Sequence, residues 1–155
     1  MSNLIIELFY YKKDSIMERY SRIKEKISGK GLKVTPQRVA VFEAVMNLNH
    51  PSADQIKEYV KQNHPGISTG AVYNILESFA EKELLNRVKT GKGVMRYDAI
   101  LEKHHHLYCE ECDKIADYND QELDALLENY FNSKSIDNFL VKDIKLQIVG
   151  IFKHE

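Results

Sequence analysis

Cysteine is scarce in this 155-residue chain, which contains only Cys109 and Cys112. So few cysteines exclude a disulfide-stapled secreted scaffold, and a single C-x-x-C pair suits the reducing cytoplasm. Long apolar runs are also missing, since none approaches the roughly 20 residues of a membrane-spanning helix. The apolar start at Leu4–Phe9 contains an acid and lacks a small-residue cleavage site, so we do not interpret it as a signal peptide. We therefore expect a cytoplasmic protein that does not interact with membranes.

Net charge is almost absent as well, at −1, but this value hides an asymmetry between two parts of the chain. Residues 1–96 contain 16 lysines and arginines against 10 acidic residues, whereas residues 97–155 contain 6 against 13. A basic segment can approach phosphate, and an acidic segment can attract cations. With 43% hydrophobic residues, the chain is long enough for one or two small domains.

Metal-ligand side chains are concentrated in the acidic part. Asp98 is followed by the run His104–His106, then by Cys109, Cys112 and Asp117. On a strand, His104 and His106 would share one face and His105 would point away. Imidazole suits divalent iron, zinc, copper and nickel, and carboxylate suits harder ions such as manganese. The mixed nitrogen and oxygen set favours an exchangeable transition metal over a buried all-thiolate zinc. The alternative to any metal site is a solvated histidine run.

Apolar residues at helical spacing predict four helices in the basic part. The first covers Met17–Ser28, and the second starts at Thr35-Pro36, a cap followed by proline. After the break at His50-Pro51, Ser52 and Gln55 form a capping box for the third. The expected inner faces consist of Tyr20, Ile23 and Ile27, of Val39, Phe42, Val45 and Met46, and of Ile56, Tyr59 and Val60.

A fourth helix, capped by Ser68 and reaching about Lys82, precedes two short strands at 84–89 and 94–99. Its core residues should be Val72, Ile75, Leu76 and Phe79, which leaves a polar opposite face. The basic turn Thr90–Gly93 between the strands resembles the wing of a winged helix. In helix-turn-helix proteins the second helix of the pair enters the major groove. The expected DNA contacts are Arg38, Thr69, Tyr73, Asn74 and Lys92.

Six short motifs appear in one order along the chain, namely Thr35-Pro36-Gln37-Arg38, His50-Pro51-Ser52-Ala53-Asp54, Ala71-Val72-Tyr73-Asn74, Arg96-Tyr97-Asp98, His104-His105-His106 and Cys109-x-x-Cys112. The chain resembles the Fur family of metal-dependent bacterial repressors over residues 17–152, and its peroxide-sensing PerR branch most closely. This resemblance implies an α+β protein, with a winged helix-turn-helix domain at 1–97 and a small metal-binding α/β dimerisation domain at 98–155.

The resemblance also implies a regulatory site for Fe²⁺ or Mn²⁺. With iron bound, peroxide is expected to oxidise His50 and His104 and so release a palindromic operator from a homodimer. Asp117 and Asn74 favour the PerR branch, since iron-sensing relatives typically have glutamate and arginine there. The implied metal ligands are His50, Asp98, His104, His106 and Asp117.

The chain departs from the family pattern at a structural zinc site. A closed site needs four ligands, but Phe152 and Glu155 stand where the second cysteine pair is expected. We therefore expect this zinc to be absent, with packing around Phe152 in its place; reduced thiols or zinc completed by another chain are the alternatives. An auxiliary metal site is also unsupported, because Lys103 and Ile144 replace histidines.

The acidic part also carries the pattern of a dimerisation domain. Leu123, Leu126, Leu127, Tyr130 and Phe131 form a helical apolar stripe, and Ile144, Leu146, Ile148 and Phe152 alternate as in a half-buried strand. Two-fold dimers are the commonest assembly, and they match palindromic sites.

Other functions remain open at this stage. Among metal-dependent repressors, the alternatives are an iron-responsive repressor and then a zinc-responsive one. Thiol oxidation at the C-x-x-C pair is an alternative to histidine oxidation as the redox mechanism. Two histidines and a carboxylate also serve non-haem iron enzymes, but no separate acid, base or substrate motif accompanies them, so we expect no enzyme. An architectural DNA-binding protein would keep its DNA affinity in chelator.

Overall fold

The computed structural model describes residues 16–153 and divides the chain into two compact units. The first unit runs to Val88 and resumes at Met95–Leu101, and the second contains Lys89–Val94 and the chain from Glu102 onward. The extra stretch at residues 1–14 lies outside the described residues. Within residues 16–153, no helix is both long and apolar enough to cross a membrane.

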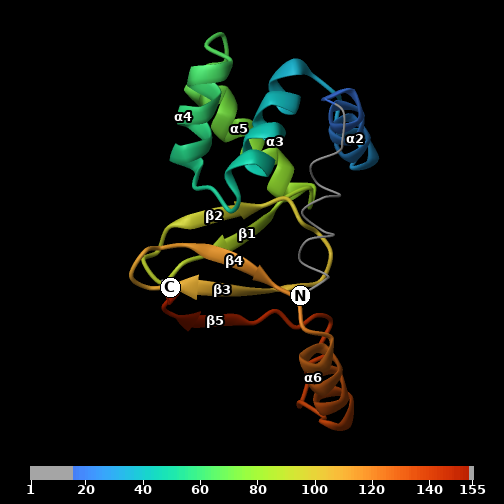
Figure 1. Ribbon diagram of the computed structural model, residues 1–155. Coiled ribbons are helices and arrows are strands. Elements are labelled where there is room, and N and C mark those ends of the chain that lie inside the picture. The colour runs from blue at the N-terminus through green and yellow to red at the C-terminus, as the bar shows by residue number, and fades with distance from the viewer. Residues whose placement is uncertain (1–15, 154–155) are drawn as a thin grey trace. The chain divides into compact units, whose positions relative to one another are not determined.

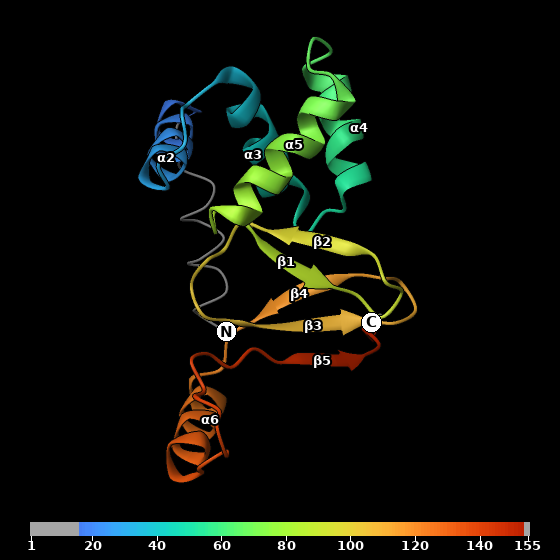
Figure 2. The same cartoon turned by 180° about the vertical axis from the view of Figure 1, so that it is seen from behind.

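Within residues 16–101, the first unit contains four helices and a two-stranded sheet (Figure 1). The helices are α2 (Ile16–Gly29), α3 (Pro36–Leu48), α4 (Ala53–Asn63) and α5 (Thr69–Glu81), and the strands are β1 (Asn86–Lys89) and β2 (Met95–Asp98). This order confirms the winged-helix architecture expected from the sequence. Figure 2 shows α5 crossing α3, with which it shares the core of the unit.

The helix boundaries follow from local capping. Thr35 accepts a hydrogen bond from the Arg38 amide, and Pro36 occupies the first position of α3. Ser52 and Gln55 exchange both hydrogen bonds of the expected capping box at the start of α4. Ser68 caps α5 by accepting a hydrogen bond from the Ala71 amide at 3.2 Å. These side chains satisfy amides that have no partner inside the helix.

The core of the first unit is formed where the apolar helix faces meet. Phe42 and Phe79, both fully buried, pack edge to face with ring centroids 5.8 Å apart. Two expected members of the inner faces are instead substantially exposed, namely Tyr20 and Met46. The remaining expected core residues are buried or partly buried against the same cluster.

The second unit is built on a three-stranded sheet of order β4-β3-β5 (Figure 1). Strand β3 (His105–Cys109) pairs antiparallel with β4 (Ile115–Tyr118) and parallel with β5 (Gln147–Gly150). A parallel pair needs a crossover connection, and α6 (Gln121–Ser133) with the segment after it provides this one. Asp120 caps α6 by accepting hydrogen bonds from the Glu122 and Leu123 amides.

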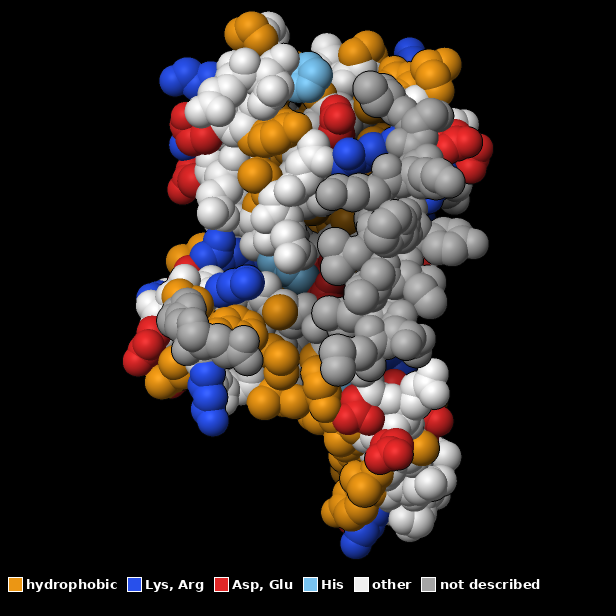
Figure 3. Space-filling model, in the orientation of Figure 1, with side chains coloured by type: hydrophobic (Ala, Val, Ile, Leu, Met, Phe, Trp, Pro, Cys, Tyr) orange, Lys and Arg blue, Asp and Glu red, His pale blue; other side chains and the backbone are white. Residues whose placement is uncertain are grey.

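The apolar stripe of α6 and the residues of β5 are not buried in the single chain. Every residue of β5 is exposed, including Ile148, whereas the other members of the expected alternation are half-buried, namely Ile144, Leu146 and Phe152. Leu126 and Tyr130 on α6 are 64% and 53% exposed. Figure 3 shows apolar side chains continuing from this unit's sheet along one side of α6.

Candidate metal centre and DNA-binding residues

His50 and Asp98 lie together in the first unit, although 48 positions separate them in the chain. The cause is backbone pairing: the Tyr97 amide donates to the Pro51 carbonyl at 2.9 Å, and Ser52 forms an antiparallel bridge with Arg96. In that antiparallel register, position 50 lies opposite position 98. The His50 Nε2 atom is 4.0 Å from the Asp98 Oδ1 atom, and both side chains are buried.

The backbone that presents His50 is strained. Asn49 and His50 have φ angles of 52° and 51°, in the left-handed region that favours glycine. Such conformations cost about 1–3 kcal/mol each and cluster at functional sites. The Asn49 side chain also orients the ring, since its Oδ1 atom lies 3.0 Å from His50 Nδ1. This oxygen can only accept, so Nδ1 carries the proton and Nε2 carries the lone pair.

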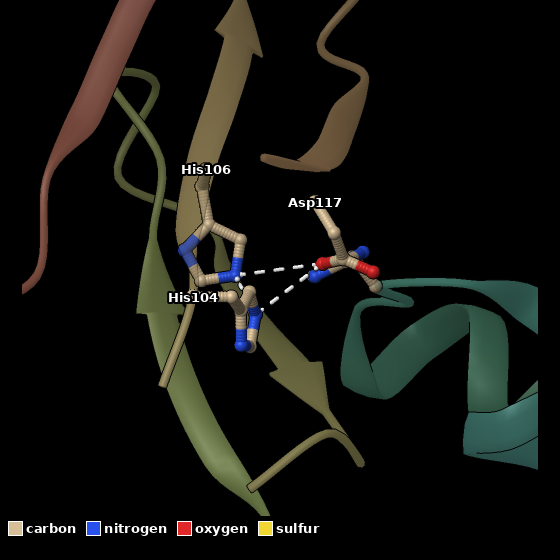
Figure 4. Close-up of side chains that lie close together, drawn as sticks. His104, His106 and Asp117 are labelled. Carbon is tan, nitrogen blue, oxygen red and sulfur yellow. Dashed lines mark hydrogen bonds and ion pairs between the residues drawn. The ribbon is translucent and has the colours of Figure 1, made fainter. Parts of the chain in front are cut away.

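His104, His106 and Asp117 converge in the second unit (Figure 4). His104 and His106 are two positions apart and therefore face the same way. The strand register sets Asp117 opposite His106. The Nε2 atoms of the two histidines are 3.0 Å apart, and Asp117 Oδ1 lies 3.3 Å from the first and 3.9 Å from the second.

The donor set in the second unit fits a metal ion. His104 Nδ1 lies 2.8 Å from the Glu102 carbonyl oxygen, so this nitrogen is the donor and the lone pair is on Nε2. Metal-binding histidines generally donate their other ring N–H in this way. Two buried imidazoles beside a carboxylate suit a divalent transition metal such as iron, zinc or manganese.

His105 points to the opposite face, as its strand position predicts. The Leu146 amide donates to His105 Nδ1 at 3.1 Å, so the ring proton is on Nε2, which lies 3.3 Å from Asp124 Oδ1. Lys103 contributes the positive charge of this cluster, with its Nζ atom 3.3 Å from Asp124 Oδ1 and 2.9 Å from Glu128 Oε1. An ammonium group therefore lies among the acidic side chains that an auxiliary metal would need.

Cys109 and Cys112 are free thiols at the turn between β3 and β4. Cys109 is buried and Cys112 is exposed. Phe152, which was expected to pack in place of the zinc, is half-buried and lines a cavity together with Cys109. The Lys114 ammonium lies 5.3 Å from the centroid of its ring.

The expected DNA contacts on α5 are Thr69, Tyr73 and Asn74, and all three are exposed. The Tyr73 hydroxyl donates a hydrogen bond to Asp54 Oδ1 at 3.0 Å, and Lys57 forms an ion pair with the same oxygen at 2.8 Å. Asp54 raises the pKa of Tyr73, chiefly through this hydrogen bond. The hydroxyl therefore stays protonated at neutral pH, and its proton becomes available to a phosphate oxygen only when the bond to Asp54 is exchanged for one to DNA.

The two basic residues among the expected DNA contacts, Arg38 and Lys92, and the two arginines of the hairpin strands differ in how free their side chains are to bind phosphate. Arg38 is half-buried, and its Nη1 atom donates to the Lys33 carbonyl at 2.7 Å. Arg87 is paired with Glu77 at 2.6 Å, and Arg96 donates to Gln55 Oε1 at 2.7 Å. Lys92 is exposed at the hairpin tip, which belongs to the second unit.

Two partial ligand sets thus lie in different units, one with His50 and Asp98 and one with His104, His106 and Asp117. Sequence reasoning missed the groups that orient them, namely Asn49, the Glu102 carbonyl and the Ile100 amide, which donates to Asp98 Oδ1 at 2.8 Å. A backbone group leaves no trace in residue identity, and an asparagine beside a helix break is common, so no sequence signal identified them.

The model of the Ferric uptake regulator family matches residues 29–149 of the chain. Among curated proteins, the peroxide operon regulator of Bacillus subtilis is 32% identical over 128 residues, 82% of this chain and 86% of that protein. The peroxide-responsive repressor PerR of Staphylococcus saprophyticus is 29% identical over 124 residues, 79% of this chain and 82% of the repressor.

Solved structures share the fold. The ferric uptake regulator of Pseudomonas aeruginosa, solved with manganese, superposes with a TM-score of 0.69 at 20% identity, covering 85% of this chain and 98% of that one. The peroxide stress regulator of Campylobacter jejuni gives a TM-score of 0.62 at 21% identity, covering 92% and 99%. At these identities, the likeness supports the winged helix and the α/β domain but no shared ligand.

Proposed function

Because the chain belongs to the ferric uptake regulator family, whose members are metal-dependent regulators of transcription, we propose that it is a peroxide-sensing repressor. In this proposal, residues 1–97 read DNA and residues 98–155 bind metal and form the dimer. It works in the cytoplasm, without a membrane partner and without catalytic turnover. We propose peroxide sensing because the similar regulators of Bacillus subtilis and Staphylococcus saprophyticus carry that function in their names.

The observation that carries the proposal is the pair of oriented ligand sets. In each set, an oxygen acceptor holds a histidine Nδ1–H, so that Nε2 presents its lone pair near a carboxylate. Neither set alone supplies more than three protein ligands. We propose that one ion takes His50, Asp98, His104, His106 and Asp117 together and thereby couples the two units. Metal then favours the DNA-binding state because it binds that state more tightly.

Iron and manganese would act differently at this site. Ferrous iron supplies electron-transfer chemistry with peroxide, whereas manganese fills the same nitrogen and oxygen ligands without that sensitivity. His50 and His104 would each gain one oxygen atom from peroxide, and the second oxygen would leave as water. Oxidation of either ring weakens a ligand to the ion. The coupling between the units is then lost, and the operator is released.

The proposed DNA contacts are Arg38, Thr69, Tyr73, Asn74 and Lys92. The exposed face of α5 offers hydroxyl and amide groups suited to base edges and phosphates. A palindromic operator is proposed because dimers of this kind read two related half-sites.

The proposal is tested by DNA binding under defined metal. A fluorescent duplex, selected from a random library by the manganese-loaded protein, is titrated by anisotropy. We expect tight binding with Mn²⁺ or Fe²⁺, and at least about 10-fold weaker binding with chelator, a typical coupling free energy. A peroxide pulse should release DNA from the iron-loaded protein alone. Metal-dependent binding that peroxide leaves intact would instead favour the second candidate, an iron-responsive repressor; binding unaffected by chelator would contradict both.

The dimer should depend on the exposed apolar residues of α6. Leu126→Glu is expected to shift the protein from dimer to monomer in sedimentation velocity, because a charge would be buried in the apolar interface. Asn132→Glu adds the same charge at an exposed polar position of α6 and should leave the dimer intact. Dimers of unchanged stability in Leu126→Glu would exclude this helix face as the interface.

A further inference from the structure

The two cysteines occupy a tight turn that the proposed metal centre does not use. Cys109 is the last residue of β3, and its amide donates to the Lys114 carbonyl at 2.9 Å. The Asp113 amide donates back to the Cys109 carbonyl at 3.0 Å, and Asp113 has a φ of 56°. This turn brings the Cys112 amide to 3.4 Å from Cys109 Sγ. The thiol that starts the motif thus accepts a hydrogen bond from the backbone of the residue that ends it.

These donors favour a thiolate at Cys109. Hydrogen bonding from the Cys112 side chain, followed by the amides of Cys112 and Phe152, lowers the pKa of Cys109 to about 7. A substantial fraction of Cys109 is therefore ionised at neutral pH. The thiolate is the nucleophilic form of cysteine.

Open space lies beside Cys109. The register pairs Leu107 with Ile148 and Cys109 with Gly150, so these four positions share one face of the sheet. Gly150 has no side chain to cover Cys109, and a Cβ atom placed there would meet nothing within 4 Å. A cavity of about 140 Å³ lies along strands β3 and β5, and Cys109, Gly150 and Phe152 are among the residues that line it. It has room for a molecule the size of a peroxide.

We propose that Cys109 and Cys112 form a second peroxide-reactive centre, a dithiol that is oxidised by a hydroperoxide without any metal. The Cys109 thiolate attacks one peroxide oxygen, the O–O bond breaks, and an S–O bond forms as hydroxide leaves and is protonated to water. The Cys112 sulfur then attacks Cys109 Sγ, so that an S–S bond forms and the S–O bond breaks. The departing oxygen takes the remaining thiol proton and leaves as a second water. Two thiols and one hydrogen peroxide thus give one disulfide and two waters.

This inference goes beyond the proposed function, because histidine oxidation requires iron and the dithiol does not. The full chain is reduced, treated with a strong chelator and desalted, then exposed to hydrogen peroxide with chelator present. Free thiols are alkylated and counted by mass spectrometry. We expect a loss of 2 Da, with both thiols protected from alkylation, at a rate that rises as pH passes through about 7. The same sample without iron should show no added oxygen on histidine, so the two proposals fail separately.

Three variants separate the roles. Cys112→Ser should accumulate a sulfenic acid at Cys109, trapped by a 1,3-dione probe, and Cys109→Ser should react at least about 10-fold more slowly than the parent chain. Gly150→Val extends a side chain into the space beside Cys109, so it should slow oxidation several-fold while Cys112 alkylates at an unchanged rate. Complete alkylation of both thiols after peroxide would overturn the proposal. So would one equivalent of zinc retained through the chelator with both thiols protected from peroxide.

Discussion

Replacing His106 with alanine should weaken manganese binding by at least about 100-fold and abolish metal-dependent DNA binding. The buried His106 ring faces His104 and Asp117, so its loss leaves two ligands in the second unit. Even outer-shell partners of metal ligands contribute 10–100-fold in affinity. The measurement is a Mn²⁺ titration against a competing indicator, followed by anisotropy with the selected duplex.

The matched control is His64→Ala, which removes a histidine at the end of α4 outside both ligand sets. It should bind manganese and DNA as the parent chain does. Thermal unfolding of the metal-free His106→Ala variant should remain cooperative, which separates a lost ligand from a lost fold. Parent-like manganese affinity in a folded His106→Ala protein would remove this histidine from the site.

Phe42→Ala should reduce the free energy of unfolding of the first unit by about 3–5 kcal/mol. The fully buried Phe42 packs edge to face on Phe79, so truncation removes apolar contacts and leaves a cavity between α3 and α5. Urea unfolding followed by circular dichroism measures the effect. In so small a domain, such a loss lowers the melting temperature by more than about 10 °C.

A neighbour on the same helix provides the comparison for this variant. Met46→Ala removes a side chain that is 36% exposed, and we expect a loss below about 1 kcal/mol. Phe42→Leu keeps most of the buried volume and should cost less than about 1.5 kcal/mol, which guards against a variant that does not fold. Equal losses for Phe42→Ala and Met46→Ala would contradict the assignment of the core.

The helices of the first unit could be predicted from sequence because their signals are local. A cap lies within three residues of the amide that it satisfies, as at Thr35 and Ser52. Core positions followed from the helical period, since spacing fixes which residues share a face. Met46 was nonetheless predicted wrongly, because an apolar residue at the edge of a face is buried only if a neighbouring element reaches it.

Strand limits depended on contacts that the sequence does not reveal. The first strand of the hairpin was expected from position 84 but begins at Asn86. The amides of Leu84 and Leu85 both donate to the Phe79 carbonyl, so the end of α5 takes the donors that a strand would need. Likewise, the alternation predicts that Ile148 is half-buried, but β5 is an exposed edge strand, and no element within residues 16–153 covers that residue.

Some contacts between the candidate ligands could be predicted from local spacing, and others depended on long-range pairing. The period of a strand was enough to predict that His104 and His106 face one way and His105 the other. Asp117 reached them through the antiparallel register of β3 and β4, and His50 reached Asp98 through the bridge between Ser52 and Arg96. Strand register depends on pairing between distant segments. These two contacts were therefore expected from the family resemblance and not from the spacing of residues along the chain.

The most direct test of the account is peptide mass spectrometry after a brief peroxide pulse. One sample is loaded with ferrous iron without oxygen, and a parallel sample is loaded with manganese. We expect one added oxygen atom on the peptides that contain His50 or His104, in the iron sample only. Unmodified histidines in an iron-loaded protein would contradict peroxide sensing through this site.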